Sequence, residues 1–216
     1  MRKSVYSLVL MDDVVEAVDQ LAYQEGTSRS NMINRILAQY TRLATPEERI
    51  QDIFSAVNAV LDSQSALQPL LTAGDAVLAL RSALQYKYNP SMRYTVELNR
   101  NLGEELGVLR ASLRTQSPAL TLYLGQFYKL WAQLEAACLP GPAREAQASG
   151  ARYTRVLRTP ETACSAQQLG GAIADYVRLF DACLKQYFSA LDDAADASRR
   201  VQACYTQHLG ALAAQL

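Results

Sequence analysis

The chain of 216 residues is 50% hydrophobic and 19% charged, a balance typical of a globular protein with one or two domains. Its 21 Lys and Arg residues equal its 21 Asp and Glu residues in number, so the net charge favours neither nucleic acid nor membrane as a partner. A single histidine excludes a multi-histidine metal site, and no glycine-rich phosphate-binding loop occurs. We therefore expect no enzymatic activity, no cofactor and no metal ion.

The sequence also points to a compartment. No apolar run approaches the roughly 20 residues that cross a membrane, and the first residues lack the apolar core of a signal peptide. The four cysteines are far apart and form no Cys-x-x-Cys pair, which suggests free thiols in a reducing environment. We expect a cytoplasmic protein with no membrane partner; its cysteines are Cys138, Cys164, Cys183 and Cys204.

Residues 4–10 predict a strand with one buried face. Two sets of side chains alternate along the segment, and this period of two is typical of a half-buried strand. One face carries Tyr6, Leu8 and Leu10, and the other carries Val5, Ser7 and Val9.

Two short amphipathic helices are expected next. Asp12 is suited to cap the first helix, and Gly26 to end it in the left-handed conformation. Ser28 is suited to cap the second helix, whose apolar stripe includes Ile33 and Leu37.

One strand and two helices cannot enclose a core alone. About 45 residues bury little surface, and a single strand has no partner for its N–H and C=O groups. A twofold dimer solves both problems, because the two strands pair antiparallel and the helices interlock. We expect the dimer core to consist of Tyr6, Leu8, Leu10, Ile33 and Leu37.

The run from Tyr6 to Tyr40, YSLVLMDDVVEAVDQLAYQEGTSRSNMINRILAQY, resembles the ribbon–helix–helix (Arc/MetJ/CopG-type) DNA-binding family. The strand, the acidic cap, the Glu-Gly-x-Ser-Arg-Ser turn and the closing aromatic residue follow one another at the spacing of that family. The match covers about a fifth of the chain. The resemblance implies that paired strands enter the major groove and that their exposed side chains read the bases.

Carried over by position, the base readers are Val5, Ser7 and Val9, with Arg2 and Lys3 nearby. Two of these readers depart from the family pattern, in which such residues are typically polar or basic. Valine can contact a thymine methyl group but cannot hydrogen-bond a base. A second interpretation is therefore a ribbon that only dimerises.

The resemblance also places the start of the second helix against DNA phosphate. The free N–H groups of a first helical turn attract anions, which supports the same assignment independently. The expected phosphate contacts are Ser28, Arg29 and Ser30.

A new segment is expected to begin at Thr45. Thr45, Pro46 and Glu48 combine a cap, a first-turn proline and a capping-box glutamate, and the apolar spacing continues the helix to about residue 67. A further short helix through residue 80 is plausible.

Residues 84–114 change to a period of two. They predict three short strands, over 84–88, 92–98 and 109–114, in an antiparallel meander. The solvated face of this meander is basic, since residues 81–114 contain six basic and three acidic residues. An alternative is a helix over 102–113.

The last hundred residues are expected to be largely helical. A helix capped by Ser117 carries Trp131 in its core-facing stripe, and 143–163 reads as a long loop. Heptad spacing over the last fifty residues predicts one long helix or a hairpin of two helices that turns near Asp192–Asp196. Cys183 and Cys204 are interpreted as small apolar fillers of the core.

Together these patterns predict a mainly α protein with a minor β component. Residues 1–45 are expected to form a ribbon–helix–helix domain that dimerises and binds DNA, and residues 46–216 a helix-rich α+β domain that serves assembly or binds a protein partner. The expected function is that of a sequence-specific DNA-binding protein, a transcriptional regulator of bacterial type that binds double-stranded DNA as a homodimer or a higher even oligomer. Two alternatives stay open: a structural protein that uses the ribbon only to dimerise, and an accessory factor in the partition or processing of plasmid or mobile-element DNA.

Overall fold

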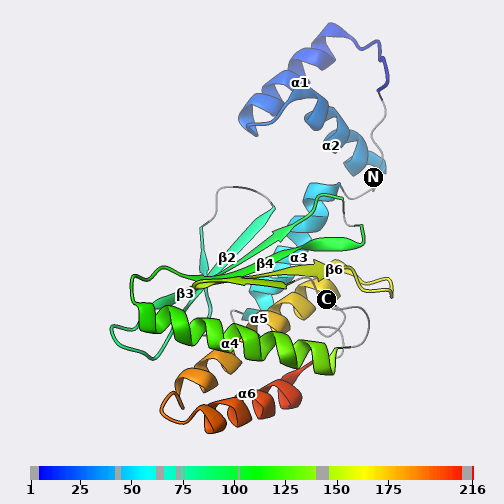
Figure 1. The fold of residues 1–216 in the computed structure, drawn as a ribbon. Helices are drawn as coiled ribbons and strands as arrows, with labels where there is room; N and C mark the ends of the chain where they lie inside the picture. The colour runs from blue at the N-terminus through cyan, green and yellow to red at the C-terminus, as the bar shows by residue number, and fades with distance from the viewer. Residues whose placement is uncertain are drawn as a thin grey trace. The chain divides into compact units, whose positions relative to one another are not determined.

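A computed structural model describes residues 5–41, 45–61, 66–71, 74, 76–101, 103–139, 146–210 and 216. It divides the chain into two compact units, residues 1–49 and residues 50–216. Each unit has its own cluster of buried apolar side chains. The two units are therefore described separately, with the elements labelled as in Figure 1.

The N-terminal unit contains two helices, α1 (Asp12–Gln24) and α2 (Arg29–Thr41). The turn between them follows the expected chemistry. Gly26 has a φ of 61°, in the region that favours glycine. The Ser28 hydroxyl accepts a hydrogen bond from the Asn31 N–H at 3.3 Å, which caps α2. At α1 the expectation was wrong in detail, because Met11 is the N-cap and no side chain caps the helix.

The expected N-terminal ribbon is not formed. Residues 5–11 have no regular secondary structure, and the first element of the described chain is a helix. A strand needs a neighbour for its N–H and C=O groups, and no strand of the chain pairs with this segment among the described residues. The expectation of a strand over 4–10, and of a ribbon–helix–helix as the observed N-terminal fold, is therefore wrong for this structure.

Helix α3 (Pro46–Leu61) begins with the expected capping box. The Glu48 N–H donates to the Thr45 hydroxyl at 3.1 Å, and the Thr45 N–H donates to the Glu48 carboxylate at 2.8 Å. Its end was placed too late, because the helix stops at Leu61 rather than near residue 67.

A six-stranded antiparallel sheet forms the centre of the C-terminal unit, where three strands were expected. Its strand order is β1-β2-β3-β4-β6-β5. The strands are β1 (Gln68–Leu70), β2 (Val77–Ala83), β3 (Ser91–Leu98), β4 (Glu105–Leu113), β5 (Ala146–Ser149) and β6 (Arg152–Arg158).

Several segments therefore differ from the expectations. Strand β3 lies where one was expected, but residues 84–88 lead into a turn. Tyr88 and Asn89 have φ values of 65° and 44°, so the backbone reverses direction where the side-chain alternation continues. Strands β1 and β2 replace the expected helix before residue 80, β4 replaces the alternative helix over 102–113, and β5 and β6 occupy the expected loop over 143–163.

Strand β4 lies very close to strand β3 at Gly107. The register between β4 and β6 shifts between Glu105 and Gly107. A Cβ atom on Gly107 would lie 2.1 Å from the Glu97 carbonyl oxygen. Only glycine fits this contact between β4 and β3.

Three helices, α4 (Pro118–Cys138), α5 (Ala166–Phe188) and α6 (Ala194–His208), lie on one side of the sheet (Figure 1). Ser117 caps α4 as expected, since its side chain accepts from the Leu120 N–H. Trp131 of α4 is fully buried, and its ring lies 4.8 Å from that of Phe180 in α5. Helix α3 also packs against α5, where Gly170 leaves room for Ala56 and Ile53.

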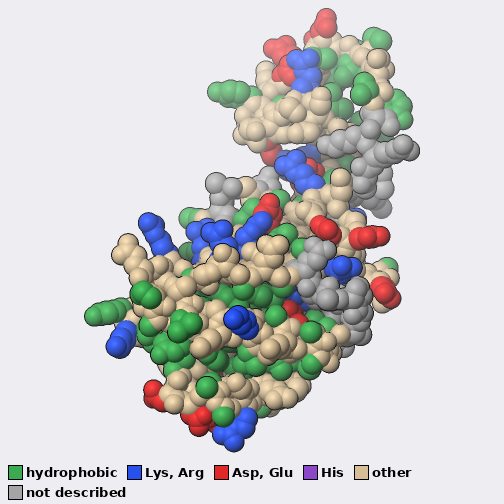
Figure 2. Space-filling view, viewed as in Figure 1, with side chains coloured by type: hydrophobic (Ala, Val, Ile, Leu, Met, Phe, Trp, Pro, Cys, Tyr) green, Lys and Arg blue, Asp and Glu red, His purple; other side chains and the backbone are tan. Residues whose placement is uncertain are grey.

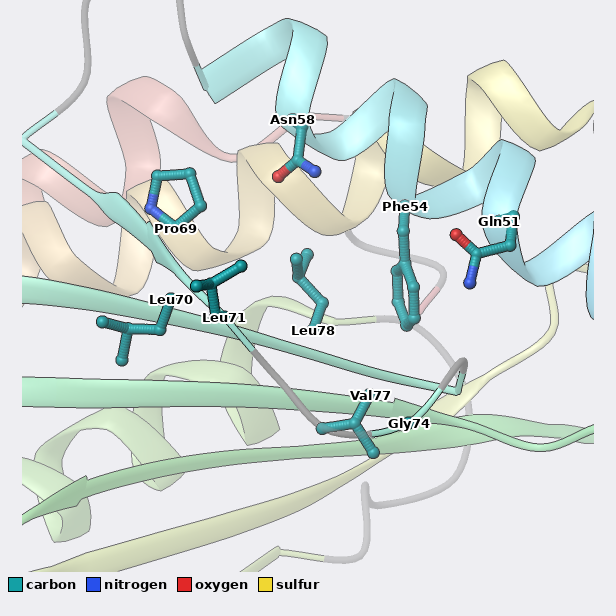
Figure 3. Close-up of a pocket in the computed structure, with 9 residues that line it drawn as sticks. All are labelled: Gln51, Phe54, Asn58, Pro69, Leu70, Leu71, Gly74, Val77 and Leu78. Atoms are coloured by element: carbon teal, nitrogen blue, oxygen red, sulfur yellow. The ribbon is translucent and has the colours of Figure 1, made fainter. Parts of the chain in front are cut away.

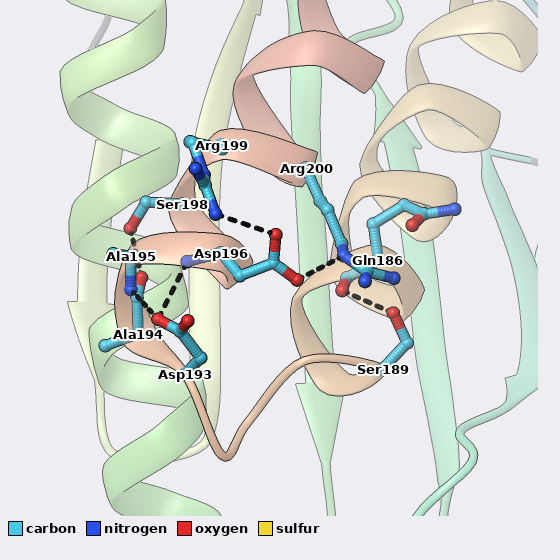
Figure 4. A network of polar contacts seen from close by, with 9 residues as sticks. All are labelled: Gln186, Ser189, Asp193, Ala194, Ala195, Asp196, Ser198, Arg199 and Arg200. Atoms are coloured by element: carbon cyan, nitrogen blue, oxygen red, sulfur yellow. Dashed lines mark hydrogen bonds and ion pairs between the residues drawn. The ribbon is translucent and has the colours of Figure 1, made fainter.

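Helices α5 and α6 form a hairpin, which was one of the two expectations for the last fifty residues. The Asp193 carboxylate caps α6 by accepting from the Ala195 and Asp196 N–H groups at 2.9 and 3.0 Å (Figure 4). The Asp196 carboxylate in turn binds Arg199 and Arg200. The break therefore lies at the aspartates that the sequence marks, because they cap a new helix.

The fold class thus needs correction. Six helices accompany a six-stranded sheet whose strands contain 38 residues in all, and this is more than a minor β component. The two helices of the N-terminal unit, the helix that begins at Pro46, the helix after Ser117, the helical hairpin and strand β3 follow the expected arrangement.

Candidate functional site

The residues expected to read DNA lie on an exposed, extended segment. Val5 and Val9 are fully exposed, and Ser7 is exposed as well. The expected dimer-core side chains of this segment are also exposed, with fractions of 81% for Tyr6, 62% for Leu8 and 40% for Leu10. Within one chain, side chains on both faces of the segment are exposed, so burial does not distinguish the expected dimer face from the expected DNA face. Arg2 and Lys3 lie outside the described residues.

The core of the N-terminal unit is very small. It consists of Val18, Ala22 and Met32, with Ile33 packed against it and partly buried. Leu37, the other helical residue of the expected dimer core, is 51% exposed. The structure therefore does not bring the five expected core residues together within one chain.

Large apolar side chains are concentrated on the surface of this unit. Of the fifteen large hydrophobic residues that are exposed in the described chain, twelve lie between residues 5 and 40. Apolar patches of this kind mark interaction sites. The twelve are Val5, Tyr6, Leu8, Val9, Leu10, Met11, Val14, Leu21, Tyr23, Ile36, Leu37 and Tyr40.

The start of α2 is occupied by an ion pair within the chain. Arg29 Nε donates to Asp19 Oδ1 at 2.5 Å, and Nη2 donates to the second carboxylate oxygen. This hydrogen bond lowers the pKa of Asp19 and raises that of Arg29. Ser28 and Ser30 are exposed beside it. Arg29 must therefore leave or share Asp19 if it is to contact phosphate.

A second exposed ion pair joins the same helices, because Arg35 Nη1 lies 2.6 Å from Glu25 Oε2. Exposed pairs contribute little to stability, typically up to about 1 kcal/mol. Helices α1 and α2 are therefore joined by a three-residue core and two weak surface contacts.

The C-terminal unit holds a buried ionic cluster that the sequence did not reveal. Glu135 of α4 accepts hydrogen bonds from the Tyr153 and Tyr176 hydroxyls at 3.0 and 2.7 Å. Arg155 of β6 is fully buried, with its Nε 3.0 Å from Glu135 and its guanidinium 4.4 Å from the centre of the Tyr176 ring. Burial raises the pKa of both tyrosines, which keeps them neutral donors. The cluster is a closed part of the core rather than an acid–base site.

A second buried acid lies in the same unit. Asp181 of α5 accepts from the Tyr94 hydroxyl at 2.9 Å and from the Ser82 hydroxyl at 3.1 Å. Lys185 lies 2.7 Å from the same carboxylate. These contacts join α5 to β2 and β3 and satisfy a charge that would be costly to bury alone.

Two cysteines meet between α5 and α6. A hydrogen bond from the Cys183 thiol lowers the pKa of Cys204 to about 6, and His208 lowers it as well. The contact with Cys204 and burial raise the pKa of Cys183. Cys183 is fully buried, in agreement with its interpretation as an apolar filler, whereas Cys204 is partly exposed and His208 is exposed.

A surface pocket of about 400 Å³ lies between α3 and the β1–β2 hairpin (Figure 3). Its lining is mostly apolar, including Phe54, Pro69, Leu71 and Leu78, and its polar side chains are the amides of Gln51 and Asn58. No charged or nucleophilic side chain is among its described lining residues, so we assign no acid–base chemistry to it.

The described residues contain neither a candidate metal centre nor a candidate membrane span. Their His, Cys, Asp and Glu side chains form no group of three or more that could hold a metal ion. None of their helices has the length and apolar character needed to cross a membrane.

Sequence reasoning missed the strand β6 and with it several functional candidates. The core face of β6 carries Tyr153, Arg155 and Leu157, and the buried arginine interrupts the apolar alternation that would have revealed a strand. Comparison of the chain with family models, with curated proteins and with solved structures finds no match in any of the three.

Proposed function

We propose that the protein binds double-stranded DNA as a homodimer and acts in the cytoplasm as a transcriptional regulator, with residues 5–41 forming the dimer and contacting DNA. The observation that carries the proposal is the set of twelve exposed apolar side chains on a unit that buries only three. The resemblance of residues 6–40 to a family of dimeric DNA-binding proteins supports the same conclusion.

A second copy of the chain is the partner that this surface fits best. The extended segment offers unpaired backbone groups together with Tyr6, Leu8 and Leu10, and an identical segment can satisfy both needs. Burial of apolar surface contributes about 25 cal/mol per Å². Burial of the exposed apolar side chains other than Val5 and Val9 between two copies would therefore stabilise their association.

The DNA contacts follow from this arrangement. Contact between the two copies through Tyr6, Leu8 and Leu10 leaves Ser7, between two valines, free to face a groove. Arg29 lies at the start of α2, where the N–H groups of the first turn favour phosphate. In the complex Arg29 binds phosphate, either in place of the Asp19 carboxylate or together with it.

The proposal is tested with the full chain and a charge placed on the apolar surface. Leu8→Asp should convert the dimer to a monomer in sedimentation equilibrium and weaken DNA binding in the same preparation. Leu122→Asp is the matched control, since Leu122 is 60% exposed and Leu8 is 62% exposed. It lies on α4, outside the N-terminal unit, and should leave both properties unchanged. A wild-type monomer, or a Leu8→Asp dimer with normal DNA binding, would contradict the proposal.

A second candidate is an interaction protein whose N-terminal unit only dimerises. Val5 and Val9 favour it, because two of three base-reading positions cannot hydrogen-bond a base. The salt dependence of binding distinguishes the two candidate functions. DNA binding weakens steeply with salt as counterions are released, whereas an apolar protein interface does not.

A further inference from the structure

One face of the sheet in the C-terminal unit is covered by none of the described helices. Side chains that alternate with the buried ones on β2, β3, β4 and β6 point away from α4, α5 and α6. We call this the open face. Figure 2 shows several Lys and Arg side chains on the side of this unit opposite α4 and α6.

The charges of the open face are unbalanced in a chain with no net charge. The strands place five arginines and two glutamates on it, as the pairing registers show. The arginines are Arg81, Arg93, Arg110, Arg152 and Arg158, and the glutamates are Glu97 and Glu105.

Three of these arginines stand in one row across the sheet. Arg81 of β2 pairs directly with Arg93 of β3, Arg93 with Ser112 of β4, and Ser112 with Arg152 of β6. Neighbouring strands are about 4.8 Å apart, so the row extends over roughly 15 Å. No acidic residue belongs to it.

This row is unfavourable for the isolated fold. Like charges directly opposite each other on adjacent strands are destabilising. The Arg81 side chain donates to the neutral side chain of Gln68 at 3.0 Å, and the side chains of Arg93 and Arg152 have no hydrogen-bond or ion-pair partner among the described residues. By contrast, Arg110 in the next row pairs with Glu97 at 2.6 Å. A polyanion supplies the missing negative charge.

We propose that the open face binds the phosphate backbone of duplex DNA through Arg81, Arg93 and Arg152. This inference extends the proposed function, on which it rests for the identity of the nucleic acid. A duplex carries one negative charge per about 1.7 Å of its axis, so it can face all three arginines together.

The side chains around the row favour a duplex over a single strand. Single-stranded nucleic acids are bound by stacking their bases on aromatic side chains. The strand positions of the open face carry Ser, Thr, Val and Ala beside the charged residues, and none is aromatic. Hydroxyl groups such as those of Ser112 and Thr154 can donate to phosphate but offer no stacking surface.

The test uses the full chain, a fluorescent duplex of mixed sequence and the corresponding single strand. The variant Arg81→Gln/Arg93→Gln/Arg152→Gln removes three charges and keeps polar side chains. Lys129→Gln/Arg199→Gln/Arg200→Gln removes the same number from exposed positions of α4 and α6. Thermal unfolding of the first variant should match or exceed that of the wild type, because facing like charges are lost.

We expect the open-face variant to bind the duplex roughly 100-fold more weakly at about 0.1 M salt, and its salt slope to fall by about 3. The control variant should keep the wild-type slope. An unchanged slope for the open-face variant, with duplex binding that still depends on Leu8, overturns this inference and leaves the proposed function standing. Duplex binding that survives Leu8→Asp but is lost in the open-face variant overturns the proposed role of residues 5–41 and leaves the assignment to the open face standing. Equal binding of the single strand overturns the assignment to duplex, and absence of any DNA binding by the wild type overturns both proposals.

Discussion

The two units of this chain solve the problem of burying apolar surface in different ways. The C-terminal unit closes its core within one chain, around Trp131, Phe127 and Phe180, and its buried charges have partners nearby. The N-terminal unit buries three apolar residues and exposes twelve large ones. From this difference we expect residues 50–216 to be stable alone and residues 5–41 to depend on a partner for stability.

The largest effect is expected from the centre of the closed core. Trp131→Ala should lower the free energy of unfolding of the C-terminal unit by about 3–5 kcal/mol, because it removes a fully buried aromatic ring. Chemical denaturation followed by circular dichroism measures it. Leu122→Ala on the same helix is 60% exposed and should change stability by less than about 0.5 kcal/mol. Similar losses for both variants would show that the core is not closed around Trp131.

Two Glu–Arg pairs of different burial give the next contrast. Glu135→Gln leaves the fully buried Arg155 without a counter-charge and should cost about 3 kcal/mol or more. Glu97→Gln removes the partner of Arg110, whose side chain is 39% exposed, and should cost at most about 1 kcal/mol. Denaturant midpoints of the two variants measure the difference. Equal costs would mean that the buried pair is not closed to water.

Protein concentration should affect only one unit. If the N-terminal unit is completed by a second copy, a hundredfold rise in concentration should stabilise the dimer by roughly 2.7 kcal/mol, about 1.4 kcal/mol per protomer, by mass action. Hydrogen exchange of residues 12–41 should slow accordingly, while exchange in β3 and α5 stays constant. Protection of residues 12–41 from exchange that does not depend on concentration would show that a second copy does not complete the N-terminal unit.

The smallest effect concerns the ion pair at the start of α2. Arg29 depresses the pKa of Asp19 below its usual 3.8, so the pair stabilises the fold above that value and the contribution is lost as pH falls through the lower, folded pKa. Arg29→Ala should return the pKa of Asp19 toward 3.8 in an NMR titration. DNA phosphate that captures Arg29 should shift it in the same direction. An unchanged Asp19 titration in Arg29→Ala would show that the pair is absent in solution.

Local signals in the sequence located many of the elements correctly. Thr45 and Glu48 form their capping box, Ser117 caps α4, and Ser28 caps α2. These succeeded because a capping bond involves residues only three positions apart. Strand β3 was found because its alternation is complete from Met92 to Leu98.

Other elements could not be predicted because their pattern depends on distant residues. Strand β2 buries three consecutive residues, Leu78, Ala79 and Leu80, so it lacks the period of two. Strand β6 contains Arg155, which is buried only because Glu135 and Tyr176 come from two helices elsewhere in the chain. The alternation over residues 4–10 was recognised, but alternation alone supplies no neighbouring strand.

The sequence by itself therefore determined the caps of α2, α3 and α4 and the apolar character of the N-terminal segment, since these depend on neighbours along the chain. Only the tertiary structure decided that Arg81, Arg93 and Arg152 share one row and that Arg155 lies inside the core. Residues 81 and 152 are far apart in sequence, and antiparallel pairing across four strands brings them onto one face. Strand register, which no local pattern specifies, is the physical reason for that juxtaposition.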